Sequence, residues 1–348
     1  MSEETPKKRR KVKRWIALGL LVLGGYCAFG GPTILKPVSP VVVLPPEETG
    51  LSIFGFQITN TILGTLIADI VLLLIAYFGV HRFAVSGKMV PSGITNAFEA
   101  IVEFLWNTVE GAAGKWGKRI FPIPATIFLL VFMANMVKLV PGFESIGYLK
   151  QVHKGTGYAP VKLFNIGSLE IFSIDKGKPS QAEASTEHAT SAGGEVEETS
   201  HEATELCTAC EIVPYLRGSA TDLNFTLGLG FLAVLFTQIY GVWALGFGYF
   251  NKFIAIKQLI SGGIFGVINF VVGLLELILE FMKIISFGFR LFGNVFGGAI
   301  LLSVIGALVA VGVPPVLYIF ELFFGVIQAY VFFLLSTIFI SMATVSHH

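Results

Sequence analysis

Charged side chains are scarce in this sequence: Asp, Glu, Lys and Arg make up 14% of its 348 residues. An average soluble domain carries about 25%. The 24 lysines and arginines nearly balance the 23 acids, so charge gives no reason to expect a nucleic-acid partner. Three cysteines are too few for a disulfide framework.

The motifs of common enzyme chemistry are also missing. The sequence has no Walker A loop, no Gly-x-Ser-x-Gly and no paired His/Cys metal set. Cys207-Thr-Ala-Cys210 is a single CxxC, and a metal site would need a second ligand pair. A local disulfide or two free thiols is the better interpretation on an oxidising face. We therefore expect no catalytic residue, no metal and no cofactor in this chain.

Hydrophobic residues, in contrast, make up 54% of the chain, and its mean hydropathy is +0.75. This composition predicts an all-α polytopic membrane protein with about six membrane segments. The apolar runs that support these segments are 15–31, 61–80, 123–140, 223–249, 262–312 and 316–342.

The N-terminal region combines a basic stretch with an apolar one. Residues 1–14 contain seven Lys or Arg, which favours a cytoplasmic location. The run 15–31 is either a cleaved signal segment or an uncleaved membrane anchor, and we favour the anchor. In both cases the segment that follows is delivered to the outer face.

Residues 32–142 are expected to form the first membrane part. Its span carries one acid, Asp69, which is either a packing residue or part of a polar path. Residues 94–109 place their apolar side chains within an arc of about 100°, opposite three glutamates. This predicts an amphipathic helix on the cytoplasmic membrane surface, because lysines and arginines flank it.

Residues 143–222 interrupt the membrane pattern with twelve acids against six Lys or Arg. We predict an insertion on the outer face, disordered over 180–206, where Ser, Thr, Glu and Gly predominate. The β-branched and apolar residues of 161–174 predict a small hairpin. Residues 223–348 would form the core helices.

The run 262–312 is too long for one ordinary span. Its 51 residues would extend roughly 77 Å as a helix, against about 30 Å of hydrocarbon. The segment is therefore either a tight hairpin or a strongly tilted helix sheltered by another protein.

Arg290 lies in the middle of this run, where an arginine costs about 2.5–3.5 kcal/mol on insertion scales. On one helix it would share an arc of about 80° with the other strongly polar side chains of the run, which are Glu276, Glu280, Lys283 and Asn294. Glu280 and Lys283 can form an i,i+3 ion pair. Arg290 has no carboxylate within a turn, so we infer a partner from elsewhere. Such a row of polar groups suggests a proton or ion path.

The motif Phe289-Arg-Leu-Phe-Gly-Asn294 closely resembles subunit a of F-type ATP synthases. The resemblance extends over roughly 50–142 and 223–342, and its arginine motif is specific. It is supported by Glu276 fourteen residues before the arginine, by Gln328 on the last span, by Met133-Ala-Asn135 before Leu139-Val-Pro141, and by Val90-Pro91.

Three positions depart from the family pattern. Lys138 stands where bacterial members often carry an acid. Ala299 occupies a position that is often ionisable, so Glu321 lacks an ionisable partner there. Glu321 itself stands where bacterial members often have histidine. Glu321 and Gln328 are seven residues apart and so share one helix face. Instead of a role in transport, they could simply form hydrogen bonds between helices.

The resemblance implies a long, strongly tilted helix pair that faces a rotating ring of c subunits. It implies peripheral-stalk b subunits, the catalytic ATPase head and membrane lipid as further partners, and a bacterial cytoplasmic membrane. The proton path would use Arg290, Glu276, Asn294, Glu321 and Gln328, with minor roles for Asp69, Asn135 and Glu280. The chain would belong to the ATP-synthesising complex without a catalytic site of its own.

Two other functions compete with this one. A secondary transporter with a mid-membrane site for a charged substrate predicts internal repeats and paired broken spans, and the sequence has no such repeat. A structural membrane scaffold would leave Arg290 and the polar stripe unexplained.

Overall fold

The computed structural model describes residues 18, 19, 22, 26, 46–53, 55–81, 85, 93–140, 143–144, 146–151, 156–166, 169–181, 207, 210–246, 248–249, 253, 263–308 and 313–345. The predicted basic terminus 1–14, most of the anchor 15–31 and most of the segment predicted to be disordered lie outside them. The chain divides into two compact units: 1–41 with 145–215 and 301–317, and the remaining residues.

The first unit contains a four-stranded antiparallel sheet. Its strands, in the order β3-β6-β4-β5, are β3 (Gly147–Gln151), β6 (Cys210–Pro214), β4 (Thr156–Ile166) and β5 (Leu169–Gln181). The predicted hairpin at 161–174 is confirmed, although β4 and β5 extend beyond it. The sheet of this insertion is larger than predicted, because β3 and β6 add two further strands to the hairpin.

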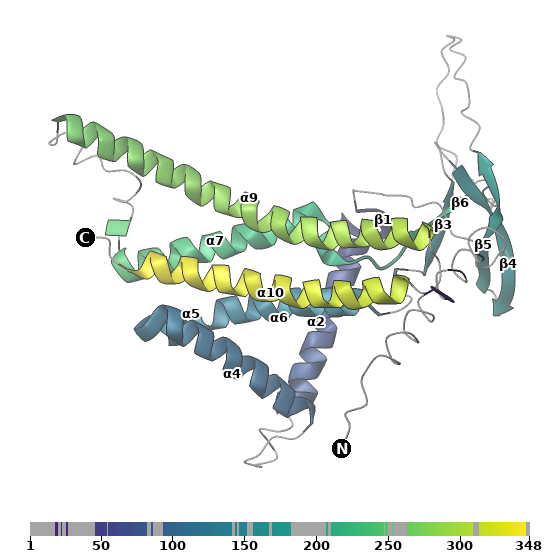
Figure 1. Ribbon diagram of the computed structural model, residues 1–348, viewed down its shortest axis with the longest axis horizontal. Helices are drawn as coiled ribbons and strands as arrows, with labels where there is room; N and C mark the ends of the chain where they lie inside the picture. The colour runs from purple at the N-terminus through teal and green to yellow at the C-terminus, as the bar shows by residue number, and fades with distance from the viewer. Residues whose placement is uncertain are drawn as a thin grey trace, which may run out of the picture. The chain divides into compact units, whose positions relative to one another are not determined.

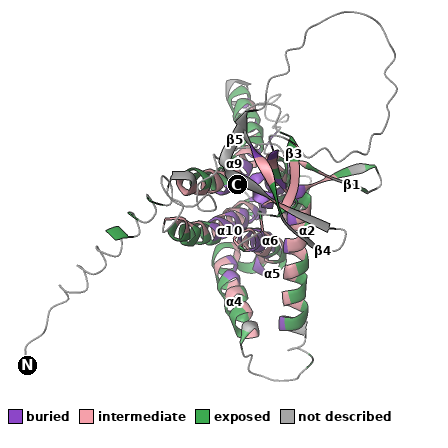
Figure 2. Cartoon of the chain, turned by 90° about the vertical axis from the view of Figure 1, so that its right-hand side faces the viewer, coloured by how far each residue is buried: buried purple, intermediate pink, exposed green. Residues whose placement is uncertain are grey.

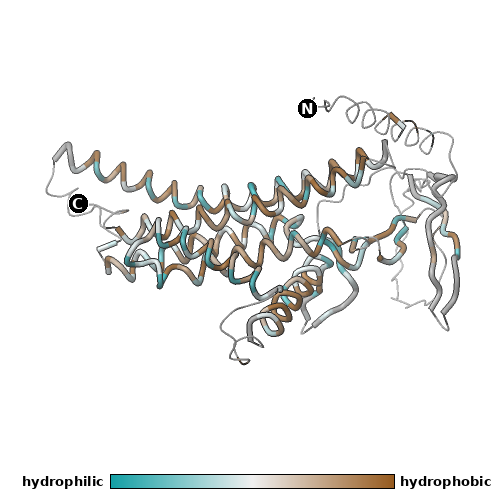
Figure 3. The backbone as a smooth tube through the Cα atoms, turned by 60° about the horizontal axis from the view of Figure 1, so that its bottom comes forward, coloured by the Kyte–Doolittle hydropathy of each residue, from teal (hydrophilic) through white to brown (hydrophobic). Residues whose placement is uncertain are grey.

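The second unit is helical apart from the hairpin β1 (Glu48–Ile53) and β2 (Phe56–Thr59). The helices labelled in Figure 1 are α2 (Asn60–Ile75), α4 (Ile94–Ala113), α5 (Gly117–Ile120), α6 (Pro122–Lys138), α7 (Leu223–Leu245), α9 (Gly263–Leu308) and α10 (Pro314–Thr344). Hydrophobic residues predominate along the helices (Figure 3).

Three of the described helices are long and apolar enough to cross a membrane: Asn60–Gly79, Leu223–Leu245 and Pro314–Thr344. A fourth span is possible if 95–120 and 122–138, which meet at 98°, count as one. The sequence predicts about six. The sharp bend agrees with the prediction of an amphipathic helix followed by a span, and α4 buries Leu105 and Val109 while exposing Glu103.

Helix α9 is one continuous helix of 46 residues across the long apolar run. The hairpin alternative for 262–312 is therefore wrong. At 1.5 Å per residue α9 extends roughly 69 Å. No proline occurs inside the helix to interrupt its hydrogen bonds. Pro314-Pro315 instead begins α10, where a proline at the first turn leaves no hydrogen bond unmade.

The helices share one hydrophobic core. Leu105 of α4, Val131 of α6, Leu291 of α9 and Phe332 of α10 are each at most 1% exposed and belong to the same cluster. The outer helix α2, in contrast, shows mainly exposed and intermediate residues (Figure 2). Such apolar exposure is expected where a helix faces lipid rather than water.

Asp222 joins the beginnings of two of these helices. Its carboxylate accepts a hydrogen bond from the backbone N–H of Asn224, which caps α7. The other carboxylate oxygen accepts from the hydroxyl of Thr61, in the first turn of α2, at 3.1 Å. Asp222 therefore holds the N-terminus of α2 against the N-terminus of α7. The side chains of Thr61 and Asp222 are both buried.

Candidate functional site

Helix α9 carries the predicted polar stripe, and its continuity places these residues along one face. Glu280 is buried, Glu276 and Lys283 are half-buried, and Arg290 and Asn294 are exposed. Around them α9 exposes large apolar side chains, among them Phe281 and Phe289 at 64% and 52%. The stripe therefore lies beside a surface that excludes water only when lipid or another protein covers it.

Arg290 forms no hydrogen bond or ion pair with the part of the chain that the structure describes. Its guanidinium keeps its positive charge even when it is removed from water. A partner from outside these residues is therefore required if Arg290 lies within a membrane.

On one side of Arg290, Glu280 is the centre of a hydrogen-bonded cluster. It accepts from Lys283 Nζ at 2.6 Å, which confirms the predicted i,i+3 pair, and from Gln238 Nε2 of α7 at 3.0 Å. The hydroxyl of Tyr249 donates to Gln238 Oε1 at 2.8 Å. Burial, together with the negative charges of Glu280 and Glu276, raises the pKa of Tyr249 to about 12.

On the other side of Arg290, polar groups follow α10. Glu321, Gly325 and Gln328 stand at i, i+4 and i+7 and so share a face. Asn294 of α9 donates through Nδ2 to Oε1 of Gln328. Asn135 of α6 donates to the carbonyl oxygen of Gly325 at 3.2 Å. These contacts form a polar seam, by which we mean the residues joined between α6, α9 and α10.

Glu321 ends this seam in an ion pair that the sequence does not predict. Lys138 Nζ lies 2.5 Å from Glu321 Oε1, and only 7% and 13% of the two side-chain surfaces are exposed. Position 299 supplies no ionisable partner for Glu321, as the sequence indicates, but α6 supplies one from a different position. A signal was present: Lys138 and Glu321 are the sole charges of α6 and α10.

Two buried amide groups in the seam are only half satisfied. Asn135 Oδ1 and Gln328 Nε2 have no hydrogen-bond partner among the described residues, although both side chains are at most 3% exposed. Buried polar atoms of this kind are usually paired with protein or with ordered water. Their presence favours water within the seam.

Two predicted positions lie apart from these contacts. Asp69, half-buried on α2, forms no hydrogen bond or ion pair with any described residue. Glu276 stands one turn before Glu280 on α9 and contributes to the negative potential at Tyr249. Gln238 and Tyr249 were missed by the sequence analysis, although a glutamine inside an apolar span is a recognisable signal.

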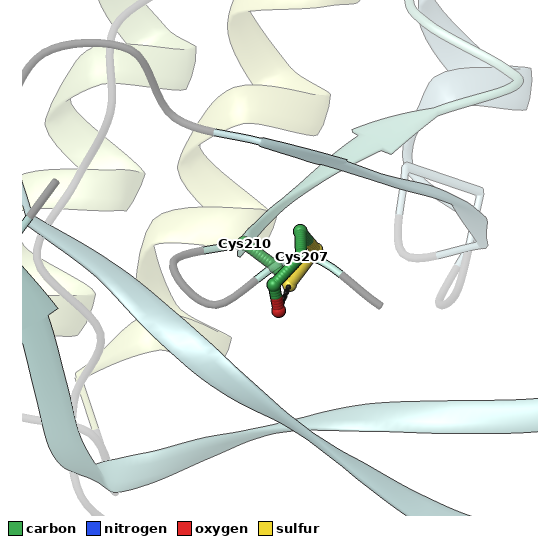
Figure 4. Close-up of a disulfide and its surroundings, with 2 residues drawn as sticks. All are labelled: Cys207 and Cys210. Atoms are coloured by element: carbon green, nitrogen blue, oxygen red, sulfur yellow. Dashed lines mark hydrogen bonds between the residues drawn. A yellow bond between two sulfur atoms is a disulfide. The ribbon is translucent and has the colours of Figure 1, made fainter. Parts of the chain in front are cut away.

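Polar groups therefore form two clusters that flank Arg290 along α9. Glu280 precedes Arg290 by ten residues, or roughly 15 Å, and Asn294 follows it by four, or roughly 6 Å. Within the described residues, no group of His, Cys, Asp and Glu could hold a metal ion. Cys207 and Cys210 form a disulfide in the sheet unit (Figure 4).

Residues 62–341 match the family model described as ATP synthase A chain. Among similar proteins, ATP synthase subunit a of Mycobacterium ulcerans is 26% identical over 294 residues, which cover 82% of this chain and 86% of that protein. The subunit a of Psychrobacter arcticus is 27% identical over 283 residues, with 78% of each chain covered. That of Helicobacter hepaticus is 25% identical over 283 residues, covering 81% and 88%.

The family match extends over most of the chain and contains every residue of the two polar clusters. Together with the apolar helices, it identifies an integral membrane protein. The chain belongs to the ATP synthase A chain family.

Proposed function

We propose that this chain is the proton-translocating subunit a of an F-type ATP synthase, with two offset half-channels that Arg290 separates. The observation that carries the proposal is the division of the polar groups of α9 into two clusters on either side of Arg290. A single through-path would instead require continuous polar contacts past the arginine.

The polar seam is the proposed outer half-channel. Its groups succeed one another from the Lys138–Glu321 pair, past Asn135, to Gln328 and Asn294. Amides both donate and accept hydrogen bonds, so water held by Asn135 Oδ1 and Gln328 Nε2 could complete the chain of proton carriers. Protons would leave the seam beside Asn294, one turn from Arg290.

Arg290 would prevent a direct leak between the half-channels. A fixed positive charge repels a proton and favours the ionised form of a carboxylate that approaches it. A carboxylate on a c-ring subunit would therefore release its proton near Arg290 and take up another beside Asn294. Lysine could not replace arginine equally well, because a desolvated lysine can become neutral.

The cluster around Glu280 is the proposed inner half-channel, with Glu276 as its next carboxylate along α9. Gln238, through its bonds to Glu280 and to Tyr249, connects it with the end of α7. Lys283 partly neutralises Glu280 and lies 4.6 Å from the ring centre of Phe339, which limits its movement. Asp69 and Asn135 keep minor roles in this proposal.

The exposed apolar face of α9 would pack, strongly tilted, against the c-ring, which resolves the excess length of the helix. Peripheral-stalk b subunits and the catalytic head are the other proposed partners, and a bacterial cytoplasmic membrane is the proposed location. We retain the division at 1–14, 15–31, 32–142, 143–222 and 223–348, with 143–222 on the outer face.

Replacing Arg290 with alanine tests the function. Arg290→Ala should abolish proton-driven ATP synthesis in reconstituted vesicles while the complex still assembles. Lys118→Ala, which removes an exposed positive charge from α5, is the matched control and should leave synthesis near the parental rate. Near-parental synthesis by the Arg290→Ala complex would refute the proposal.

A secondary transporter remains the competing function, but two observations disfavour it. The family match covers 62–341, and α9 is an unbroken helix rather than one of the paired broken spans that such transporters use.

A further inference from the structure

The outer end of the polar seam contains a second carboxylate beside Lys138. The side chains of Lys138 and Glu144 both lie beside Gly218, where a Cβ would approach Lys138 Cδ to 3.0 Å and Glu144 Oε1 to 3.5 Å. The N–H of Gly218 donates to Glu144 Oε1 at 3.0 Å and so fixes this carboxylate. Glu144 is exposed, whereas Lys138 and Glu321 are mostly covered.

An exposed carboxylate therefore lies near a mostly covered lysine, which in turn pairs with a mostly covered carboxylate. Tyr318 of α10 lies within electrostatic range of both Glu144 and Glu321, and Arg217 adjoins Gly218 in the chain. Glu144 thus brings a carboxylate in contact with water close to the covered lysine.

We propose that Lys138 is a proton carrier at the entrance of the outer half-channel and that Glu144 collects protons for it. This inference rests on the proposed function. It assigns a titrating role to a lysine, where a purely structural ion pair would need only a fixed positive charge.

The transfer step conserves charge. A proton moves from Lys138 Nζ to Glu321 Oε1 across the 2.5 Å contact, which leaves a neutral amine and a neutral carboxylic acid. Both charges disappear in the same step, so neither group is left as an unpaired covered charge. The acid passes its proton along the seam, and the amine regains one through water from the carboxyl group of Glu144.

Lys138→Arg separates this role from a structural one. Arginine keeps the positive charge and can still pair with Glu321, but it does not release its proton. We expect an assembled complex whose proton-driven synthesis is at least about 100-fold slower, the lower end of the range for a lost acid–base group. Lys118→Arg, at an exposed position of α5, controls for the substitution itself. A Lys138→Arg complex with parental rates would overturn the proposal.

A neutral pair gives an independent test. Replacing a buried ion pair with uncharged residues of similar volume is often tolerated, so Lys138→Met combined with Glu321→Gln should assemble yet conduct poorly. Exchanging the charges, Lys138→Glu with Glu321→Lys, should restore part of the rate, since both groups titrate again. If the neutral pair makes ATP at the parental rate, or if exchanging the charges gives no faster synthesis than the neutral pair, Lys138 and Glu321 have a packing role only.

Glu144 is tested by buffer concentration. Glu144→Gln should slow synthesis in dilute buffer, and concentrated mobile buffer should restore it, because soluble buffer then delivers protons to Lys138 directly. Glu103→Gln, an exposed glutamate of α4, is the control and should be insensitive to buffer. A Glu144→Gln rate that does not depend on buffer, whether parental or slow, would exclude Glu144 as the collector.

Failure of this inference can be told from failure of the proposed function. If Arg290→Ala, assayed in parallel, makes ATP at the parental rate, the half-channel proposal itself is wrong. If Arg290→Ala is inactive while Lys138→Arg is normal, the half-channels stand and only the lysine relay is refuted.

Discussion

Helices α7 and α9 approach each other closely at Gly230 and Gly288. Adding one methyl group at Gly230 should therefore shift α9 and with it Arg290. A Cβ on Gly230 of α7 would lie 2.9 Å from the backbone oxygen of Ile284 and 3.3 Å from the backbone nitrogen of Gly288. Both obstacles are main-chain atoms of α9, so no side-chain rotation can relieve the contact. Small residues at such crossings allow membrane helices to pack closely.

The size of the effect follows from two opposing terms. Alanine is favoured over glycine inside a helix by about 1 kcal/mol, whereas overpacking costs about 1–3 kcal/mol. Gly230→Ala should therefore destabilise the protein by roughly 1 kcal/mol once both terms are combined. Gly228→Ala should stabilise it by up to about 1 kcal/mol, because nothing lies within 4 Å of the added Cβ. The two variants should differ by about 2 kcal/mol, or roughly 30-fold in the unfolding equilibrium.

Denaturant unfolding of the purified variants in detergent can measure this difference. Trp116 and Trp243, whose ring centres are 6.3 Å apart, join α7 to the segment between α4 and α6 and provide a fluorescence signal. Proton-driven synthesis should also fall in Gly230→Ala, since α9 would move away from Gln238 and weaken its 3.0 Å bond to Glu280. Identical midpoints for the two alanine variants would refute the close-packing argument.

Two further predictions concern the outer insertion and the inner cluster. In a Cys27→Ala background, mild reduction should open the Cys207–Cys210 disulfide. An impermeant thiol reagent should then label Cys207 in intact cells. Labelling only after cell lysis would show that the proposed topology is inverted. Since the pKa of Tyr249 is raised from 10.0 to about 12, the folded state binds this proton more tightly than the unfolded one, and stability should fall as pH rises from 10 to 12. Tyr249→Phe should remove that part of the alkaline loss, as followed by unfolding at each pH, and an unchanged pH dependence would contradict the assignment.

Much of the helical unit follows from the sequence. The apolar runs 123–140 and 223–249 differ from α6 and α7 by a few residues at their ends. This agreement has a physical cause. A membrane helix needs about 20 apolar residues, so the length of an apolar run in the sequence predicts the length of the helix. The Glu280–Lys283 pair was predictable for a similar reason, because i,i+3 neighbours meet on any helix.

The contacts that depend on packing between helices could not be derived in this way. Gln238 and Glu280 are 42 residues apart, and their hydrogen bond exists only because α7 crosses α9 where it does. The pairing of β3 with β6 joins strands on either side of the β4–β5 hairpin, while the period-two pattern identifies only neighbouring strands. The long run of α9 was ambiguous because apolar length alone does not distinguish a hairpin from a tilted helix.

Single charges in apolar helices nevertheless restrict the possible contacts more strongly than composition suggests. Lys138 and Glu321 each stand alone in a helix, and opposite charges in such positions are expected to meet, as they do. Asp69 has no partner among the described residues, yet an aspartate can lose its charge by taking up a proton. Arg290 has neither a partner among those residues nor that possibility. The same reasoning that explains the Lys138–Glu321 pair therefore predicts a counter-charge for Arg290 outside the described residues, and a c-ring carboxylate that approaches and leaves, as the proposed function requires, would supply it.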